Sequence, residues 1–201
     1  DNCFFNNLKS NYYGGIGLVM DYYYPYWGSY SIHVLMFKNT KFEHIINGYG
    51  SYGGGAISID EKSGNSVTKL IVDNCYFYDI HSEKGNGGAI YFKPDDSKDF
   101  FSITITGSTF EQTYIADSSG NSQAIFIGKT TVSTEHTISY CTFIDCCGNS
   151  DNEYAIYLDA EIISFIYNNV TFTDQNKNHG CVYCSSDNKN YIHEYIGNIF
   201  Y

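Results

Sequence analysis

The sequence predicts an all-β fold in which the chain winds into a parallel β-helix, a solenoid of about six coils with three short strands per coil. A glycine-rich motif, SYGGGAISID at 51–60, returns as GNGGAIYF at 85–92 and then in weaker copies. A phenylalanine that follows a turn-like residue by three positions recurs every 28 to 37 residues. Self-similarity at this period is the signature of a repeat architecture.

The first repeated element is the strand that carries the phenylalanine. Residues two positions before it are mostly small or apolar, and the residues next to it are mostly polar. This alternation with period 2 is typical of a strand with one buried face. We therefore expect the phenylalanines to form one continuous internal stack. Its members are Phe5, Phe42, Phe77, Phe110, Phe143, Phe172 and Phe200.

A bend precedes this strand. The position three before the phenylalanine holds Asn or Gly in every copy but one, and these residues adopt positive φ most readily. The column reads Asn2, Asn39, Asn74, Gly107, Tyr140, Asn169 and Gly197, in which Tyr140 does not fit. Before the bend, a second strand places an apolar residue five positions ahead of the phenylalanine. That column reads Phe37, Val72, Ile105, Ile138, Tyr167 and Tyr195.

The third strand belongs to the glycine-rich motif. A small residue at a tight corner, such as Ala56 or Ala89, is followed by an inward aliphatic residue, then an outward one, then an inward one. The outward column reads Val19, Ser58, Tyr91, Phe126, Tyr157 and Tyr183. We expect its four aromatic residues to line one outer face at a spacing of about 4.8 Å. Two interpretations remain open: a contact surface for a partner, or packing beneath a neighbouring loop.

Composition agrees with this fold and excludes several functions. The 201 residues are 18% aromatic with 2 Pro, which favours strands over helices. The net charge is -11 and the chain has no Arg, which argues against nucleic-acid binding. No apolar run approaches the roughly 20 residues of a transmembrane helix. We interpret residues 1–201 as one β-helix domain, a segment of a longer protein.

The repeats resemble those of polymorphic outer-membrane proteins. GGAI occurs at 54–57 and 87–90, and the family's FxxN motif is literal at 4–7. At the FxxN asparagine, the other copies are assigned Ile45, Ile80, Thr113, Cys146 and Gln175. The resemblance implies a right-handed β-helix that is displayed outside the cell or at its surface and serves in adhesion.

Two variable segments are candidate sites. The longest connection contains Tyr24, Tyr26 and Trp27 in an aromatic run, which suits stacking on a sugar or anchoring a partner. The alternative is that these rings cover the coil as a cap. The acidic run KPDDSKD at 93–99 lacks the spacing of a calcium loop and is interpreted as a solvated turn.

Histidine and cysteine spacing predicts neither a metal site nor a catalytic site. His136 and His193 share a column but lie two coils apart, about 9.6 Å. Cys3, Cys75 and Cys141 are expected to be small inward fillers in alternate coils. A disulfide among Cys146, Cys147, Cys181 and Cys184 remains open, as does the redox compartment. Asn169 begins an N-x-T sequon, and we expect it to contact the backbone of a neighbouring coil and to carry no glycan.

Two functions follow from these observations. In the first, the chain is a structural or adhesive surface module without a cofactor. It binds a protein or glycan through Tyr91, Phe126, Tyr157, Tyr183, Tyr24, Tyr26 and Trp27, or associates with itself end to end or side by side. The alternative is part of a pectin-lyase-like polysaccharide lyase or hydrolase. Such a lyase would use an Arg base, which is missing, and such a hydrolase would need more converging carboxylates than Asp95 and Asp96 provide.

Overall fold

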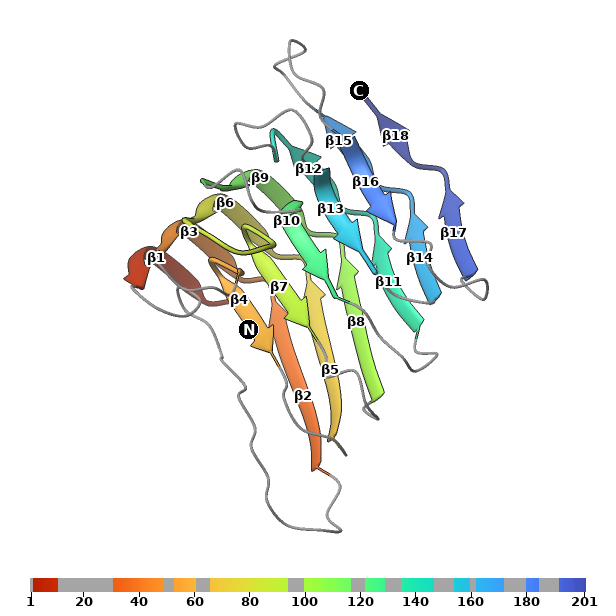
Figure 1. Cartoon of the computed structure of the whole chain (residues 1–201), viewed down its shortest axis with the longest axis horizontal. Coiled ribbons are helices and arrows are strands. Elements are labelled where there is room, and N and C mark those ends of the chain that lie inside the picture. Colours follow the sequence, from red (N-terminus) through yellow and green to blue (C-terminus); the bar gives the residue numbers. More distant parts are fainter. Residues whose placement is uncertain are drawn as a thin grey trace.

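The fold is a β-solenoid built from three parallel sheets (Figure 1). The structure, a computed structural model, describes residues 2–10, 31–48, 53–60, 66–93, 100–116, 122–128, 135–146, 154–159, 162–171, 180–184 and 192–201. Within these ranges the only regular elements are β-strands, and every strand pair is parallel. The predicted fold class is therefore confirmed.

Each sheet collects one kind of strand from successive repeats. Sheet A contains β1 (Phe4–Ser10), β3 (Lys41–Asn47), β6 (Tyr76–Ser82), β9 (Thr109–Ile115), β12 (Thr142–Ile144), β15 (Asn169–Thr171) and β18 (Ile199–Phe200). Sheet B contains β2 (Ser31–Lys38), β5 (Ser66–Asp73), β8 (Phe100–Thr106), β11 (Glu135–Ser139), β14 (Ile162–Ile166) and β17 (Ile192–Ile196). Sheet C contains β4 (Ile57–Asp60), β7 (Ile90–Lys93), β10 (Ser122–Ile127), β13 (Tyr154–Leu158) and β16 (Gly180–Cys184).

The chain visits the sheets in a fixed order. β4, β5 and β6 are consecutive in sequence and lie in sheets C, B and A, after which β7 returns to sheet C beside β4. Each coil thus adds one strand to each sheet, and the strands follow one another from red to blue in Figure 1. Equivalent residues lie next to each other, as in the pair Phe42 and Phe77. This in-register stacking is what the repeated columns predicted.

The phenylalanine column is the centre of the core. Rings 5, 42, 77, 110 and 143 stack in sequence with centroids 4.6–5.2 Å apart. The three central rings, Phe42, Phe77 and Phe110, are fully buried. The prediction of one internal stack is confirmed for these five rings.

The predicted stack is wrong at Phe172. In the next coil Val170, not Phe172, pairs with Phe143, and Val170 in turn pairs with Phe200. The bend of this coil is at Tyr167, with φ 53°, two residues before the predicted Asn169. Because the bend sets which residues pair with the neighbouring coil, the strands on both sides of it are shifted by two residues relative to the predicted alignment. The inward residue before the bend is accordingly Phe165 rather than Tyr167.

The bend column takes left-handed backbone in every described coil. Asn39 and Asn74 have φ of 50° and 51°, and Gly107 has 55°. Tyr140 also adopts this conformation, with φ 56°, although its residue type argued against it. Its backbone N–H donates to Ile166 O at 3.0 Å, in the same way that Asn74 N–H donates to Thr106 O. The hydrogen bonds between coils therefore decide the conformation against the local preference of tyrosine.

A second left-handed column lies two residues after the phenylalanine. It contains Asn7, His44, Asp79, Gln112 and Asp145, all with φ of 50–53°. Asn7 is the asparagine of the FxxN segment, and Phe5 pairs with Phe42. Its equivalents are thus polar residues such as His44 and Asp79. The assignment of Ile45, Ile80, Thr113, Cys146 and Gln175 to this place is wrong: Ile45, for example, pairs with Leu8.

Small inward residues satisfy the backbone at the bend. Ser108 Oγ accepts from Cys75 N at 3.0 Å and donates to Thr106 O at 2.9 Å. Asn168 plays the same part in a later coil: its Oδ1 accepts from Cys141 N and its Nδ2 donates to Ile138 O, both at 2.9 Å. The sequence placed Val170 in this column, and the two-residue shift gives the position to Asn168.

Two glycines of the repeated motif are required by backbone geometry. Gly54 and Gly87 have φ of 78° and 67°, where L side chains are strained. A Cβ on either would lie 2.1 Å from the carbonyl oxygen three residues ahead. The corner residues Ala56 and Ala89 that follow are buried, as predicted. The GGA sequence thus makes the tight turn that leads into sheet C.

Candidate binding surfaces

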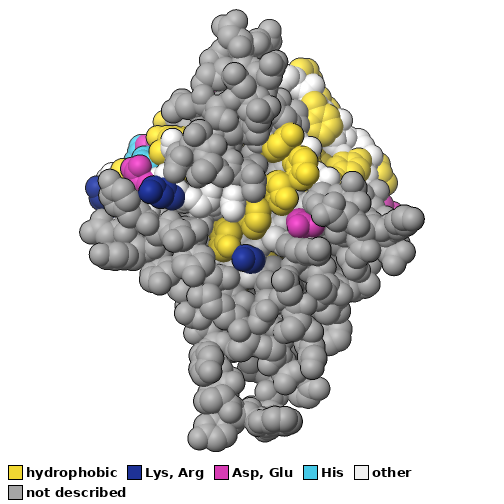
Figure 2. Space-filling view, in the orientation of Figure 1, with side chains coloured by type: hydrophobic (Ala, Val, Ile, Leu, Met, Phe, Trp, Pro, Cys, Tyr) yellow, Lys and Arg dark blue, Asp and Glu magenta, His cyan; other side chains and the backbone are white. Residues whose placement is uncertain are grey.

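The predicted aromatic column of sheet C forms a continuous ladder. Tyr91 pairs with Phe126, Phe126 with Tyr157, and Tyr157 with Tyr183. Consecutive ring centroids are 4.8–5.3 Å apart, with interplanar angles of 10–16°. Figure 2 shows a diagonal line of hydrophobic side chains on the visible face, where sheet C lies. The four residues occupy one column, as the alternation predicted.

The ladder is less exposed than the sequence suggested. Tyr91 is 5% exposed and Phe126 is 9% exposed, while Tyr157 and Tyr183 are half-buried. Part of the cover is backbone, since a Cβ on Gly128 would lie 3.2 Å from Phe126 Cε1. Of the two open interpretations, packing against the protein itself therefore holds for Tyr91 and Phe126.

Stacking also limits what the ladder can bind. Because the rings lie face to face along the solenoid axis, each interior ring uses both faces on its neighbours. The edges of Tyr157 and Tyr183 remain accessible. A sugar ring or a planar group that stacks on an aromatic face finds no free face on the interior rings, Phe126 and Tyr157. The ladder thus contributes mainly to stability, with a small accessible edge.

The structure places a second aromatic pair at the corner between sheets B and A. Tyr140 and Tyr167 lie at the bend of consecutive coils, and their rings stack at 5.4 Å and 17°. They are 65% and 51% exposed. A Cβ on Gly197, one coil further, would lie 2.4 Å from Tyr167, so this ring leans over the glycine. We call Tyr140 and Tyr167 the corner tyrosines.

The corner tyrosines have unfavourable backbone conformations without the benefit of burial. A left-handed conformation costs an L-residue roughly 1–2 kcal/mol. The other described residues of the column avoid much of that cost because all are Asn or Gly: Asn2, Asn39, Asn74, Gly107 and Gly197. Strained, exposed aromatic residues make this corner a candidate binding site. In the sequence, the misfit of Tyr140 in an Asn/Gly column was the one signal that pointed to this corner.

The outer face of sheet A, by contrast, satisfies its own charges. Lys41 Nζ lies 2.5 Å from Glu43 Oε1 and 5.4 Å from the Tyr76 ring centroid. Tyr76 Oη donates to Glu111 Oε2 at 2.7 Å. Partial burial, followed by the Glu111 carboxylate, raises the pKa of Tyr76 above its usual range. These groups hold one another and leave little for a ligand.

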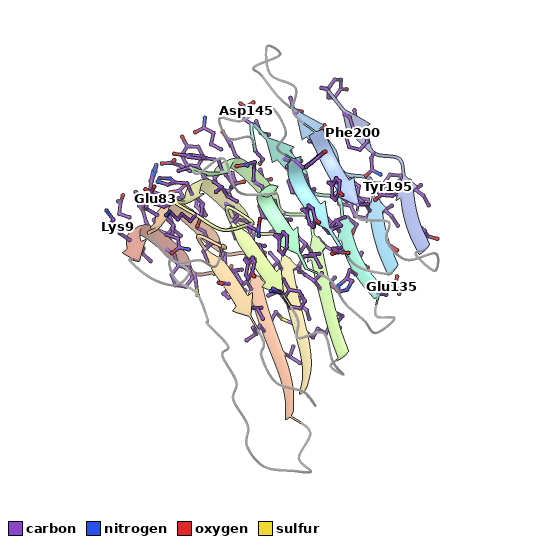
Figure 3. All side chains as sticks on the ribbon, viewed as in Figure 1. Lys9, Glu83, Glu135, Asp145, Tyr195 and Phe200 are labelled. Atoms are coloured by element: carbon purple, nitrogen blue, oxygen red, sulfur yellow. The ribbon has the colours of Figure 1, made fainter. Side chains whose placement is uncertain are left out.

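An open groove of about 530 Å³ lies along the second left-handed column. In its wall, His44 Nδ1 and Asp79 Oδ2 of the adjacent coil form a hydrogen bond of 2.7 Å. Figure 3 shows Lys9 and Glu83 at this end of the solenoid and Asp145 further along. The groove is lined by Asn6, Asn7, Leu8, Lys9, His44, Ile46 and Asp79. Its shallow, mixed lining fixes no particular ligand.

Several predicted sites lie outside the described residues. These are the aromatic run with Tyr24, Tyr26 and Trp27, and the acids Asp95 and Asp96. In the described part of the chain, no group of three or more His, Cys, Asp or Glu could hold a metal ion. No helix among the described residues is long and apolar enough to cross a membrane.

The histidine column matches the sequence interpretation. His136 pairs with Ile163, which pairs with His193, so the two histidines lie two coils apart. His136 is fully buried, and its Nδ1 accepts from Ile103 N at 3.3 Å. Burial lowers the pKa of His136 to about 4. The imidazole is therefore neutral and structural.

Cys75, Cys141 and Cys146 are buried polar fillers, as expected for Cys75 and Cys141, whereas the same expectation is wrong for Cys3, which is exposed in the terminal coil. Cys141 Sγ donates to Ser139 O at 3.3 Å, and Cys146 Sγ donates to Phe110 O at 3.3 Å. Burial raises the pKa of the Cys141 thiol to about 12. Cys147 lies outside the described residues, and of Cys181 in β16 only the backbone is described, so the predicted alternatives for a bridge among the last four cysteines stay open.

Asn169 differs from its prediction. It lies in β15, and its buried Oδ1 has no hydrogen-bond partner among the residues described. The backbone contacts expected of it are made by Asn168. That Asn169 carries no glycan stays a prediction.

Comparison with known proteins identified no relative of this chain. No protein-family model matches the chain, and searches of curated proteins and of solved structures found no match either.

Proposed function

We propose that this chain is a binding module of a surface protein, a stiff solenoid that holds aromatic side chains outward for contact with a partner protein or a glycan. It performs no catalysis in this proposal and needs no cofactor. The resemblance of its repeats to polymorphic outer-membrane proteins supports a location outside the cell or at its surface. Adhesion is the role that this location favours.

One observation carries the proposal: the corner tyrosines are exposed at positions where the backbone disfavours tyrosine. Stacking of Tyr140 on Tyr167 stabilises the folded state by about 0.5–1.5 kcal/mol. This roughly offsets the left-handed cost of about 1–2 kcal/mol for one of the two residues. Folding therefore gains nothing from the pair relative to asparagine, and a contact made by the rings explains their presence.

The solenoid supplies the rigidity that a binding surface needs. The backbone of each corner tyrosine is held by a hydrogen bond to the next coil, from Tyr140 N to Ile166 O and from Tyr167 N to Ile196 O. Side chains on such a scaffold lose little conformational freedom when a partner binds. The same scaffold presents the accessible edges of Tyr157 and Tyr183 on another face.

An adhesion assay tests this function. Beads coated at one density with the wild-type chain are applied to a panel of cultured cell types and to an array of immobilised glycans. We expect wild-type beads to adhere to at least one surface and beads with Tyr140→Asn plus Tyr167→Asn to lose that adhesion. Asparagine is the residue that the same column uses at Asn39 and Asn74, so the fold is retained.

The matched control is Tyr201→Asn, which removes an exposed tyrosine outside the bend column. Beads carrying this variant should adhere as wild type does. Wild-type beads that adhere to none of the surfaces, or equal adhesion by the double variant, would contradict the proposed function. Circular dichroism and thermal melts on every variant establish that the solenoid is intact.

A further inference from the structure

A slot one coil wide lies beside the corner tyrosines. The bend column runs from Asn74 through Gly107 to Tyr140, and Gly107 contributes no side chain. A Cβ placed on Gly107 would meet no atom within 4 Å. The column is therefore interrupted by open space between an amide and an aromatic ring.

The dimensions of the slot fit one ring. Asn74 and Tyr140 are separated by two coil steps, about 9.6 Å. A ring in van der Waals contact with both walls needs about 3.5–4.0 Å on each side, or roughly 7–8 Å in total. Tyr140 stacks on Tyr167 with one face, so its other face is directed toward Gly107. The slot is thus bounded by a free aromatic face, which the interior rings of the sheet C ladder lack.

The other wall offers hydrogen bonding. Asn74 Nδ2 donates to Asn39 Oδ1 at 2.7 Å, on the side away from the slot. Its Oδ1 is left to accept a hydrogen bond from a group beside Gly107. Thr109, two residues after Gly107, is half-buried at the start of β9 and pairs with the equally half-buried Thr142 of β12. An aromatic face opposed by an amide suits a ring that carries hydroxyl groups.

Charge selects among such ligands. The chain has a net charge of -11, which disfavours carboxylated or sulfated sugars. Lys38, a cation on the same corner, is paired with Asp73 at 3.1 Å. Thr106 Oγ1 donates to the other oxygen of the same carboxylate at 3.1 Å. A neutral ligand meets no repulsion here and needs no counter-charge.

We propose that the slot over Gly107, between Asn74 and Tyr140, binds a pyranose ring of a neutral glycan by stacking on Tyr140. This inference rests on the proposed binding function and names the ligand class of the same corner. A single stacked ring binds weakly, and several chains acting together give the avidity that adhesion needs.

Two substitutions test the slot from opposite sides. Tyr140→Asn removes the stacking face, and Gly107→Asn fills the slot without touching Tyr140. Asparagine tolerates the left-handed conformation, so both changes extend the Asn39–Asn74 pattern along the column. Tyr140→Phe keeps the ring and removes only its hydroxyl, and Tyr201→Asn removes a tyrosine elsewhere.

Affinity electrophoresis in native gels measures weak binding to soluble polysaccharides. The gels contain dextran, laminarin or galactomannan as neutral probes, or polygalacturonate as an acidic probe. We expect at least one neutral probe, and not the acidic one, to retard the wild-type chain. Tyr140→Asn and Gly107→Asn should each reduce the apparent affinity at least tenfold, whereas Tyr140→Phe and Tyr201→Asn should leave it within about threefold. Melting temperatures should stay within about 4 °C of wild type.

The inference is overturned if no neutral probe retards the wild-type chain, or if retardation survives both Tyr140→Asn and Gly107→Asn. It is also overturned if the acidic probe binds better than every neutral one. Adhesion of the beads separates these failures from failure of the proposed function. Beads that adhere through the corner tyrosines while Gly107→Asn has no effect would show that the tyrosines bind a protein partner and that the slot is not a sugar site.

Discussion

The stack of phenylalanine rings in sheet A can be tested by one substitution at its centre. Phe110 is fully buried between Phe77 and Phe143, with ring centroids at 4.6 and 5.0 Å. Phe110→Ala removes apolar volume from a site that the neighbouring coils cannot fill, and such changes cost about 3–5 kcal/mol. Because two stacked contacts are lost as well, we expect a value near the upper end, about 5 kcal/mol.

Thermal and urea unfolding, followed by far-ultraviolet circular dichroism, give the measurement. For a chain of this length, about 5 kcal/mol corresponds to a fall of roughly 10–20 °C in Tm. Phe110→Leu keeps most of the volume and should cost under about 2 kcal/mol. Phe200→Ala, at the half-exposed end of the column, should also cost under about 2 kcal/mol. Equal losses for Phe110→Ala and Phe200→Ala would refute a continuous internal stack.

Three further predictions follow. Phe126→Ser should cost about 3–4 kcal/mol, because its ring is buried in the sheet C ladder, whereas Tyr183→Ser should cost about half as much; urea unfolding of both variants checks this. Burial lowers the pKa of His136 from 6.5 to about 4, so stability is fully present above pH 6.5 and falls as the pH drops through 4; His136→Leu should flatten that part of the curve of Tm against pH. Iodoacetamide at pH 8 should label exposed Cys3 and spare Cys141, whose pKa burial raises to about 12, and peptide mass spectrometry of the native protein reads this out.

The fold was predictable because its repeats state the same pattern many times. A small residue at 56, 89, 124 and 155, followed by an inward aliphatic residue, fixes the register of sheet C without any other information. The error at Phe172 has a physical cause. The alignment followed the identity of the aromatic residue, but register is set by the bend, and a valine at 170 fills the same inward position.

Exposure was harder to predict than register. Alternation assigns Tyr91 and Phe126 to the outer side correctly, yet the preceding coil packs closely against both residues, with Gly54 beside Tyr91 and Gly87 beside Phe126. The left-handed backbone of Tyr140 could not be predicted from the sequence for a related reason. Local preference argues against it, and hydrogen bonds to the next coil impose it. Both features come from contacts between segments that are distant in sequence, which single positions do not encode.

The direction of the hydrogen bonds between coils has a mechanical consequence. They run along the solenoid axis, since each strand pairs with its equivalent in the next coil. A force that pulls the two ends apart along this axis loads the bonds of one coil at a time, as in a zipper, and not a whole sheet in shear. Under such tension the protein should lengthen in discrete steps, and each step releases the segment between two paired residues such as Phe77 and Phe110. A bending load, by contrast, is shared by three sheets around a continuous core.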